Sequence, residues 1–248
     1  PIRASGWAIR VWLAVIVAVL GTALVGVVLE RIVLRRMVGR PAFALIMITV
    51  GLLFIIQEVV TAIWGFDALN LGDPWGVDVV TFGDLVISVA DIWSIVLTAV
   101  VVSAFFAFFR YSALGLAMRA TALDQEAALA QGMSAKRVWA ASWGIAGGVA
   151  AIAGVTIAAG SGNLTPQVQF IALLAFPAII LGGLDSPGGA VLGGIIIGVV
   201  QSLTAGYQED YFSWVGTGFQ AVMPYVVMLL ILLFRPYGLF GTKEVKRV

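Results

Sequence analysis

A polar run with two carboxylates interrupts an otherwise apolar chain between Arg119 and Val138. Its chemistry is ion pairing, since Asp124 and Glu126 can pair with basic groups of another protein. One helix face carries small or weakly apolar side chains at i, i+4 and i+7: Leu123, Ala127 and Ala130. Small side chains allow close backbone approach, so the run is suited to docking in a groove of another protein. An ordinary solvated loop helix explains the same residues equally well from physics alone.

Local signals place this polar run on a helix of about three turns that lies outside the bilayer. Thr121 and the two carboxylates favour a helix start. Gly132 can supply the left-handed C′ position that ends the helix, and Ser134 can N-cap the next one. We therefore expect a sharp turn after the helix that leads into a membrane span.

The chain lacks the residue types on which most catalytic and metal sites depend. It contains no cysteine and no histidine, which excludes disulfides, thiolate nucleophiles, the usual zinc sites and a Ser-His-Asp triad. No Gly-rich loop ending in Gly-Lys-Ser/Thr occurs, so the chain has no P-loop. We expect no catalytic residue, no metal site and no cofactor bound by this chain.

Apolar residues dominate the composition. Of the 248 residues, 61% are hydrophobic and only 11% are charged, and a soluble core cannot bury that much apolar surface. Lipid must therefore be the main solvent. The 29 glycines suit close helix packing in a membrane. The prediction is an all-α, polytopic transmembrane helical bundle that forms one domain over residues 1–248.

About seven apolar stretches approach the length of a membrane span. They cover residues 11–29, 41–64, 92–109, 138–160, 168–184, 190–205 and 219–234. The fifth stretch is predicted to be interrupted at Pro177. Residues 65–91 carry carboxylates but no Lys or Arg, so they are expected to form an outer loop that could include an interfacial or re-entrant piece. Residues 206–220 are expected to form a second acidic outer loop.

The distribution of basic residues sets the predicted orientation. Of the 14 Lys and Arg residues, only Arg3 and Arg10 fall outside when the polar run is placed inside. Cytoplasmic segments of membrane proteins carry an excess of basic residues. The polar run and the basic tail after residue 234 are therefore predicted to be cytoplasmic.

Five residues could line a path for a polar solute. Glu58 is the only carboxylate well inside a predicted span, where a charge costs roughly 3 kcal/mol; it either lines a pathway or gate or reaches the outer interface. Gln57, Asn163 and Gln201 could hydrogen-bond a solute, or could equally join two helices. Pro177 and the Gly-Gly pairs mark places where the backbone could break and expose carbonyls, although helix packing explains most of them.

The polar run resembles a motif of one transporter class. Glu-Ala-Ala at residues 126–128, followed after three residues by Gly132, resembles the EAA loop of ABC-importer permeases, the coupling helix through which an ATPase subunit moves the membrane subunit. The wider string from Arg119 through Asp124 to Gly132 more narrowly resembles the permeases for branched-chain amino acids and related small polar solutes.

Other parts of the chain resemble the same permeases. The strings are LGGLDSPGGA at residues 181–190 and RPYGLFG at residues 235–241, together with the span from residue 40 to residue 65. The resemblance thus covers most of the chain from residue 31 to residue 241. Members of the family usually have a further hydrophobic stretch before this point, with an Asn-Phe-Ala-His-Gly-like string that this chain lacks. We therefore expect the native protein to have at least one more N-terminal span.

The resemblance implies a role for each residue of the motif. The resemblance implies that residues 119–137 contact the ATPase, and these residues are called the coupling segment below. The coupling residues that it implies are Arg119, Asp124, Glu126, Ala127, Ala128 and Gly132.

The resemblance also implies partners and a location. These are a second permease subunit that forms a related heterodimer, two ATPase subunits that bind ATP, a solute-binding protein and membrane lipid, with no nucleic acid. The expected location is the bacterial inner membrane, with several spans and a cytoplasmic C-terminus. The expected function is ATP-driven import of branched-chain amino acids or similar small polar solutes.

Three alternatives stay open from the sequence. A permease for urea or short amides belongs to the same class. A secondary transporter or channel working alone predicts transport without ATP and no role for residues 126–132. A scaffold membrane protein predicts that substitutions in that run do not affect flux.

Overall fold

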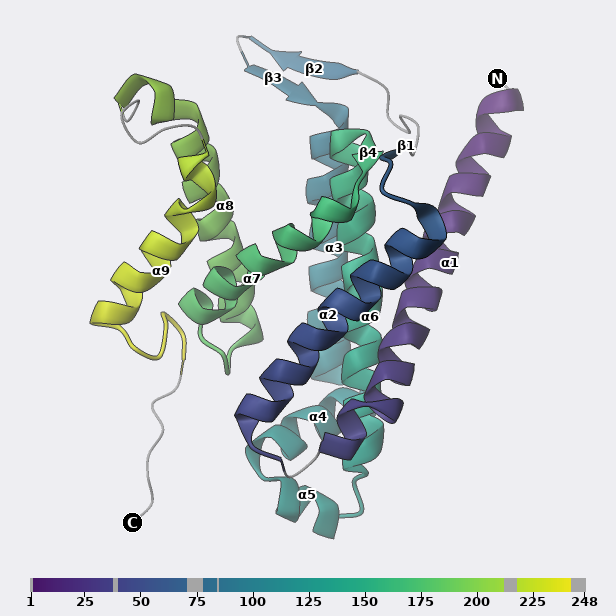
Figure 1. Ribbon diagram of the computed structural model, residues 1–248, viewed down its shortest axis with the longest axis vertical. Helices are drawn as coiled ribbons and strands as arrows, with labels where there is room; N and C mark the ends of the chain where they lie inside the picture. Colours follow the sequence, from purple (N-terminus) through teal and green to yellow (C-terminus); the bar gives the residue numbers. More distant parts are fainter. Residues whose placement is uncertain (1, 38–39, 71–77, 84, 212–217, 242–248) are drawn as a thin grey trace. The chain divides into compact units, whose positions relative to one another are not determined.

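The computed structural model describes the chain except residues 1, 38–39, 71–77, 84, 212–217 and 242–248. The chain divides into two compact units, residues 1–166 and residues 167–248, and each unit is described by itself. Most of the described residues are helical (Figure 1), which confirms the predicted all-α, polytopic bundle. Within the described ranges, five helices are long and apolar enough to cross a membrane.

The first unit contains four of these long helices. They are α1 (Ile2–Ile32), α2 (Ala42–Trp64), α3 (Val89–Tyr111) and α6 (Ala135–Ser161). Each covers a predicted span to within one residue. Apolar runs of this length form helices because a helix satisfies all of its backbone polar groups internally. Helix α3 begins at Val89, three residues earlier than predicted, since Ser88 caps it by accepting a hydrogen bond from the Ala90 N–H at 3.2 Å.

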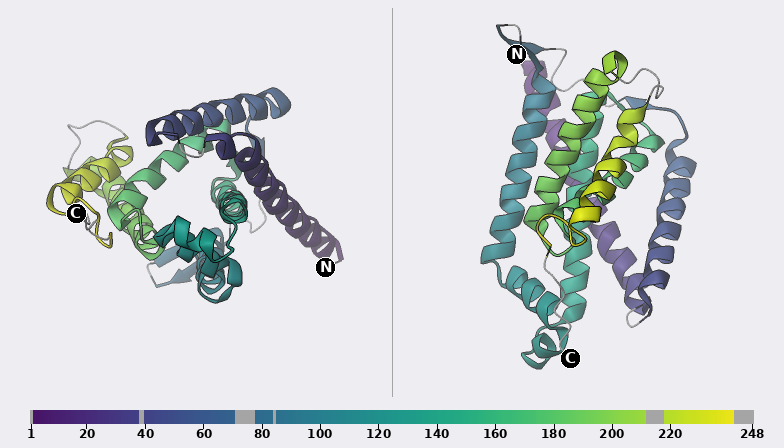
Figure 2. Two further views of the ribbon diagram at one scale, coloured as in Figure 1. Left: turned by 90° about the horizontal axis from the view of Figure 1, so that it is seen from below. Right: turned by 90° about the vertical axis from the view of Figure 1, so that its left-hand side faces the viewer.

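Shorter elements connect the long helices of the first unit. They are the 3₁₀ helix η1 (Leu34–Met37), α4 (Ala113–Leu123) and α5 (Gln125–Ala130). Figure 2 shows α4 and α5 beyond one end of α3 and α6, and α4 contacts both of these helices. The coupling segment therefore begins inside α4, contains α5 and ends in the first turn of α6.

Helices α1 and α6 pack backbone against backbone. A Cβ atom added to Gly26 of α1 would lie 2.3 Å from the carbonyl oxygen of Trp143, and one added to Gly147 of α6 would lie 2.5 Å from the carbonyl oxygen of Thr22. Only glycine fits at such distances. Helix α6 runs through Gly147 and Gly148 without a break, so this Gly-Gly pair serves helix packing, as the packing interpretation predicted.

Short strands occupy part of the predicted outer loop. Strands β2 (Val79–Phe82) and β3 (Leu85–Ser88) form an antiparallel hairpin, and β1 (Leu69–Asn70) pairs with β4 (Asn163–Leu164). The sequence analysis did not predict these strands. Val-Val-Thr-Phe and Leu-Val-Ile-Ser are β-branched and apolar runs on either side of Gly83, which is a hairpin signal. Asp73, Trp75 and Asp84 of this loop lie outside the described residues.

The second unit is built from α7 (Gln169–Gly182), α8 (Pro187–Tyr211), η4 (Phe219–Ala221) and α9 (Met223–Phe234). Pro177 is buried inside a continuous α7, so the predicted interruption of this span is wrong. Membrane helices tolerate an interior proline where neighbouring groups or small local adjustments satisfy the freed backbone carbonyl. With 14 residues, α7 is about 21 Å long at 1.5 Å per residue. Helix α7 is thus shorter than the roughly 30 Å hydrocarbon core, and the count of seven spans stays a prediction.

Glycines bring α7 and α8 into contact. A Cβ atom on Gly193 would lie 2.1 Å from the carbonyl oxygen of Ala178, and one on Gly182 would lie 2.1 Å from that of Gly189. Gly189 and Gly193 thus lie at the contact, whereas added Cβ atoms on Gly194 and Gly198 would meet no atom within 4 Å. A small core of Ala178, Leu181 and Ile197 lies at the α7–α8 contact.

The segment after α9 folds onto the turn between α7 and α8. The Leu239 N–H donates to the Leu181 carbonyl at 2.8 Å, and the Phe240 N–H donates to the Gly182 carbonyl at 3.1 Å. Gly238 has φ +77°, which favours glycine. The strings LGGLDSPGGA and RPYGLFG, noted separately in the sequence, therefore meet in one structure.

Candidate coupling surface

Helix α4 is tied to the C-terminal end of α3 by Arg119. The guanidinium donates to the carbonyl oxygen of Phe109 and, at 3.4 Å, to that of Arg110, and it lies 5.5 Å from the centroid of the Phe109 ring. The last carbonyls of a helix lack partners and carry partial negative charge. Arg119 is half-buried, so the structure places it where it fixes the direction of α4 rather than on the open surface.

The junction between α3 and α4 allows no larger residue at Gly115. The Ser112 hydroxyl accepts a hydrogen bond from the Gly115 N–H at 2.8 Å and caps α4. A Cβ atom on Gly115 would lie 2.5 Å from the Phe109 carbonyl oxygen. Helix α4 therefore leaves α3 through a tight, defined turn.

The predicted single helix of about three turns is wrong, because Asp124 divides it. Asp124 is extended (φ −153°, ψ 105°), and its Oδ1 accepts a hydrogen bond from the Ala127 N–H at 2.9 Å. An aspartate side chain that bonds to the backbone in this way competes with a continuing helix and favours a new start. Thr121 lies in α4, where its hydroxyl donates to the Ala117 carbonyl at 2.7 Å. Only the six residues from Gln125 to Ala130 form α5.

The predicted end of the helix at Gly132 is confirmed. Gly132 has φ +81°. Its N–H donates to the Leu129 carbonyl at 2.9 Å, and the Met133 N–H donates to the Ala128 carbonyl at 3.0 Å, which is a Schellman motif. Ser134 occupies the N-cap position of α6, as predicted, but its side chain makes no capping hydrogen bond.

The outward side of α5 combines acidic and apolar side chains. Ala128 is buried with 5% of its surface exposed, whereas Leu123 is 89% exposed and Leu129 is 49% exposed. We define the coupling surface as these exposed apolar and acidic side chains at the start of α5 and along it: Leu123, Asp124, Glu126, Ala127 and Leu129. The sequence analysis missed Leu129, because the i, i+4, i+7 pattern assumed one continuous helix. Two apolar side chains beside two carboxylates suit a groove with an apolar floor and a basic rim.

A partly buried ion pair lies near the coupling segment, and the sequence analysis missed it too. Arg35 Nε is 3.0 Å from Glu30 Oε1, and Arg35 Nη2 is 2.8 Å from Glu30 Oε2. Arg35 Nη2 also donates to the Lys136 carbonyl at 3.3 Å. Only 1% of the Glu30 side chain is exposed. Charged residues at the end of a span indicate which side of the membrane that end faces. Their spacing in the sequence does not show that Arg35 contacts Lys136, which is 101 residues away.

The five pathway candidates lie on four elements. Glu58 is exposed and Gln57 half-buried on α2, and Asn163 is exposed in β4. Pro177 is buried in α7, and Gln201 is half-buried in α8. Asn163 of β4 is paired with Asn70 of β1 in the first unit, so it belongs to a strand rather than to a helix. A role of these residues in solute passage stays a prediction.

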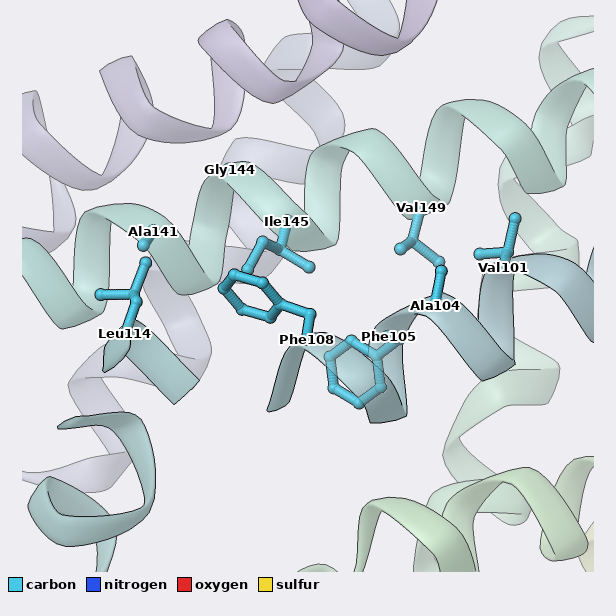
Figure 3. A pocket seen from close by; sticks show the side chains of 9 residues that line it. All are labelled: Val101, Ala104, Phe105, Phe108, Leu114, Ala141, Gly144, Ile145 and Val149. Carbon is cyan, nitrogen blue, oxygen red and sulfur yellow. The ribbon is translucent and has the colours of Figure 1, made fainter. Parts of the chain in front are cut away.

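An apolar groove of about 490 Å³ runs between α3 and α6 (Figure 3). Its lining consists of Val101, Ala104, Phe105, Phe108, Leu114, Ala141, Gly144, Ile145 and Val149. Such a lining offers no side-chain partner to a zwitterion, whose burial without polar partners is strongly unfavourable. The groove is therefore suited to an apolar ligand rather than to a polar solute. Across the described ranges, no three acidic side chains gather closely enough to hold a metal ion.

Comparisons with known proteins agree with the motifs. Residues 2–234 match the family described as the permease component of branched-chain amino acid transport systems. No solved structure matches the chain.

Named relatives are transport permeases rather than enzymes. The high-affinity branched-chain amino acid transport system permease protein LivH of Salmonella typhimurium is 36% identical over 160 residues, which are 64% of this chain and 49% of the relative. The permease protein BraD of Pseudomonas aeruginosa is 34% identical over 165 residues, which are 66% of this chain and 52% of the relative. The probable LivH of Methanocaldococcus jannaschii is 32% identical over 139 residues, or 54% and 43% of the two chains.

The chain spans about half the length of these relatives. The family match and the apolar helices both indicate a multi-pass membrane protein. The chain therefore belongs to the family of permease components of branched-chain amino acid transport systems.

Proposed function

We propose that this chain is the membrane-spanning permease subunit of an ATP-driven ABC importer. Its substrates are branched-chain amino acids or similar small polar solutes that a solute-binding protein delivers. The observation that carries the proposal is the coupling surface, a short helix with exposed apolar and acidic side chains that is fixed at both ends. The family match supports the same function.

The proposal includes the other subunits of the importer. Two ATPase subunits bind and hydrolyse ATP, and this chain binds no cofactor. A second, related permease subunit completes the pathway, and the solute-binding protein docks on the outer side. The location is the bacterial inner membrane, with the coupling segment and the C-terminus in the cytoplasm, because the basic residues gather on that side.

In the proposed mechanism, closure of the ATPase subunits pushes on α5. The Asp124 cap and the turn at Gly132 hold α5 in shape, so the push reaches its neighbours instead of unwinding the helix. Arg119 passes displacement of α4 to the end of α3, while residues 131–134 lead directly into α6. Rigid-body movement of these helices then alternates access to the pathway.

Charge reversal on the coupling surface tests the proposal. The complete importer is reconstituted in proteoliposomes with Glu126→Lys, and binding-protein-stimulated ATP hydrolysis and solute uptake are measured. We expect both to fall, because the lysine would repel a basic rim on the ATPase. Arg36→Glu is the control charge reversal, since Arg36 is an exposed residue of η1 that lies outside the coupling surface. Equal stimulation and uptake in the two variants would refute the coupling role.

A further inference from the structure

The ion pair of Glu30 and Arg35 joins three segments at one end of the first unit. Glu30 lies in the last turn of α1, and Arg35 lies on η1, which leads toward α2. The Lys136 carbonyl belongs to the first turn of α6. A single guanidinium on η1 therefore contacts the ends of two helices that are far apart in the sequence.

The position of Lys136 connects this ion pair with the coupling segment. Lys136 follows Gly132 by four residues, so the first turn of α6 is the next element that a displacement of α5 reaches. From there, Arg35 offers a direct polar contact to α1 and η1. The contact lies outside the coupling surface itself, because Glu30 is buried and Arg35 is only 27% exposed.

We propose that Glu30 and Arg35 are positioning residues that transmit displacement of the coupling segment from α6 to α1 and to η1. This inference rests on the proposed function. The glycine contacts already hold residues 19–27 of α1 against residues 143–148 of α6. The ion pair adds η1, so that α1, α6 and η1 move as one body when the ATPase pushes.

The geometry favours transmission over a merely stabilising role. Two parallel N–H···O bonds between guanidinium and carboxylate define both distance and orientation. A buried ion pair adds little to stability compared with well-packed apolar side chains of similar volume, so its distinctive property is the fixed geometry. Lysine at position 35 would provide a charge but not this fork.

The direct test is the amount of solute taken up per ATP hydrolysed by the complete importer in proteoliposomes. Arg35→Gln removes the fork, and Arg36→Gln is the matched control, because Arg36 is an exposed neighbour on the same 3₁₀ helix. We expect Arg35→Gln to retain stimulated ATP hydrolysis but to lower uptake per ATP at least about fivefold, the lower range of measured couplings between sites. Arg36→Gln should keep the parental ratio. An equal ratio in the two variants would overturn the proposal.

Arg35→Lys keeps the test decisive if Arg35→Gln does not assemble, because lysine still places a positive charge beside the buried Glu30 but cannot form the fork. Its uptake per ATP should fall likewise, and a parental ratio would overturn the proposal.

A cysteine pair tests the same link in a second way. The chain has no cysteine, so Arg35→Cys combined with Lys136→Cys can be joined by a short, reducible bifunctional thiol reagent, with the treated parent importer as control. Joining the two positions should restore uptake per ATP, and reduction should abolish it again. A joined variant whose ratio stays low would show that the ion pair does not act as a mechanical link.

The proposed function and this inference can fail separately. Loss of stimulation in Glu126→Lys, together with a parental uptake ratio in Arg35→Gln, would refute only the role of the ion pair. Unchanged stimulation in Glu126→Lys would refute the proposed function, and with it the transmission that depends on it.

Discussion

The guanidinium of Arg119 lies over the ring of Phe109, 5.5 Å from its centroid, and donates a hydrogen bond to the carbonyl oxygen of the same residue. This contact joins the first residue of the coupling segment to the end of a membrane helix. Arg119 therefore holds α4, and through it α5, in a fixed place relative to α3.

Replacement of Arg119 should loosen the coupling segment. Arg119→Met keeps an apolar stem over Phe109 but removes the hydrogen bonds to the α3 carbonyls. We expect a loss of about 2 kcal/mol in stability, typical of hydrogen bonds to charged groups, measured as a lower unfolding temperature in detergent. Arg137→Gln is the control, because Arg137 is an exposed arginine in the first turn of α6. A parental unfolding temperature for Arg119→Met would contradict this role.

Asp124 allows the cap and the charge to be separated. Asp124→Asn keeps a side-chain oxygen for the Ala127 N–H, whereas Asp124→Ala removes it and should destabilise the start of α5 by about 1 kcal/mol. Hydrogen exchange at the Ala127 amide should therefore become faster in the alanine variant and change little in the asparagine variant. Equal exchange rates in both variants would show that the Asp124 side chain does not hold α5.

The close contact between α1 and α6 predicts a contrast between two glycines of α1. Gly26→Ala places a Cβ atom 2.3 Å from the Trp143 carbonyl oxygen, whereas Gly21→Ala meets no atom within 4 Å. Overpacking of this kind costs roughly 1–3 kcal/mol. Thermal unfolding in detergent should show Gly26→Ala well below the parent and Gly21→Ala at or above it. The reverse order would contradict the described packing.

Adjacent glycines of α8 give the same contrast in the second unit. A Cβ atom on Gly193 would lie 2.1 Å from the Ala178 carbonyl oxygen, and one on Gly194 would meet open space. We expect Gly193→Ala to lower the unfolding temperature and Gly194→Ala to leave it unchanged or raise it, since alanine favours helices over glycine. Similar temperatures for both variants would show that α8 does not pack on α7 through Gly193.

The features that the sequence predicted well depend on local physics. A membrane span requires a long apolar run, so α1, α2, α3 and α6 follow directly from composition along the chain. Gly132 was predicted because a left-handed residue after a helix is usually glycine, and its φ of +81° agrees.

Other features depend on contacts that sequence patterns do not contain. The helix-start signals around Asp124 fit one helix or two, and only the orientation of its side chain toward the Ala127 N–H decides between them. The contact of Phe240 with Gly182 joins backbone atoms 58 residues apart, and the Arg35–Lys136 contact joins atoms 101 residues apart. Hydrogen bonds to distant backbone carbonyls leave no periodic pattern in the chain.

The most direct measurement of the central claim is site-specific cross-linking from the coupling surface in membranes that contain the complete importer. A photoreactive amino acid replaces Leu123, which is 89% exposed beside the acidic side chains, and in a second variant it replaces Val79, which is 55% exposed in the hairpin. We predict a covalent adduct between position 123 and the ATPase subunit and none from position 79. The absence of an ATPase adduct from position 123, or equal adducts from both positions, would contradict docking of the ATPase on α5.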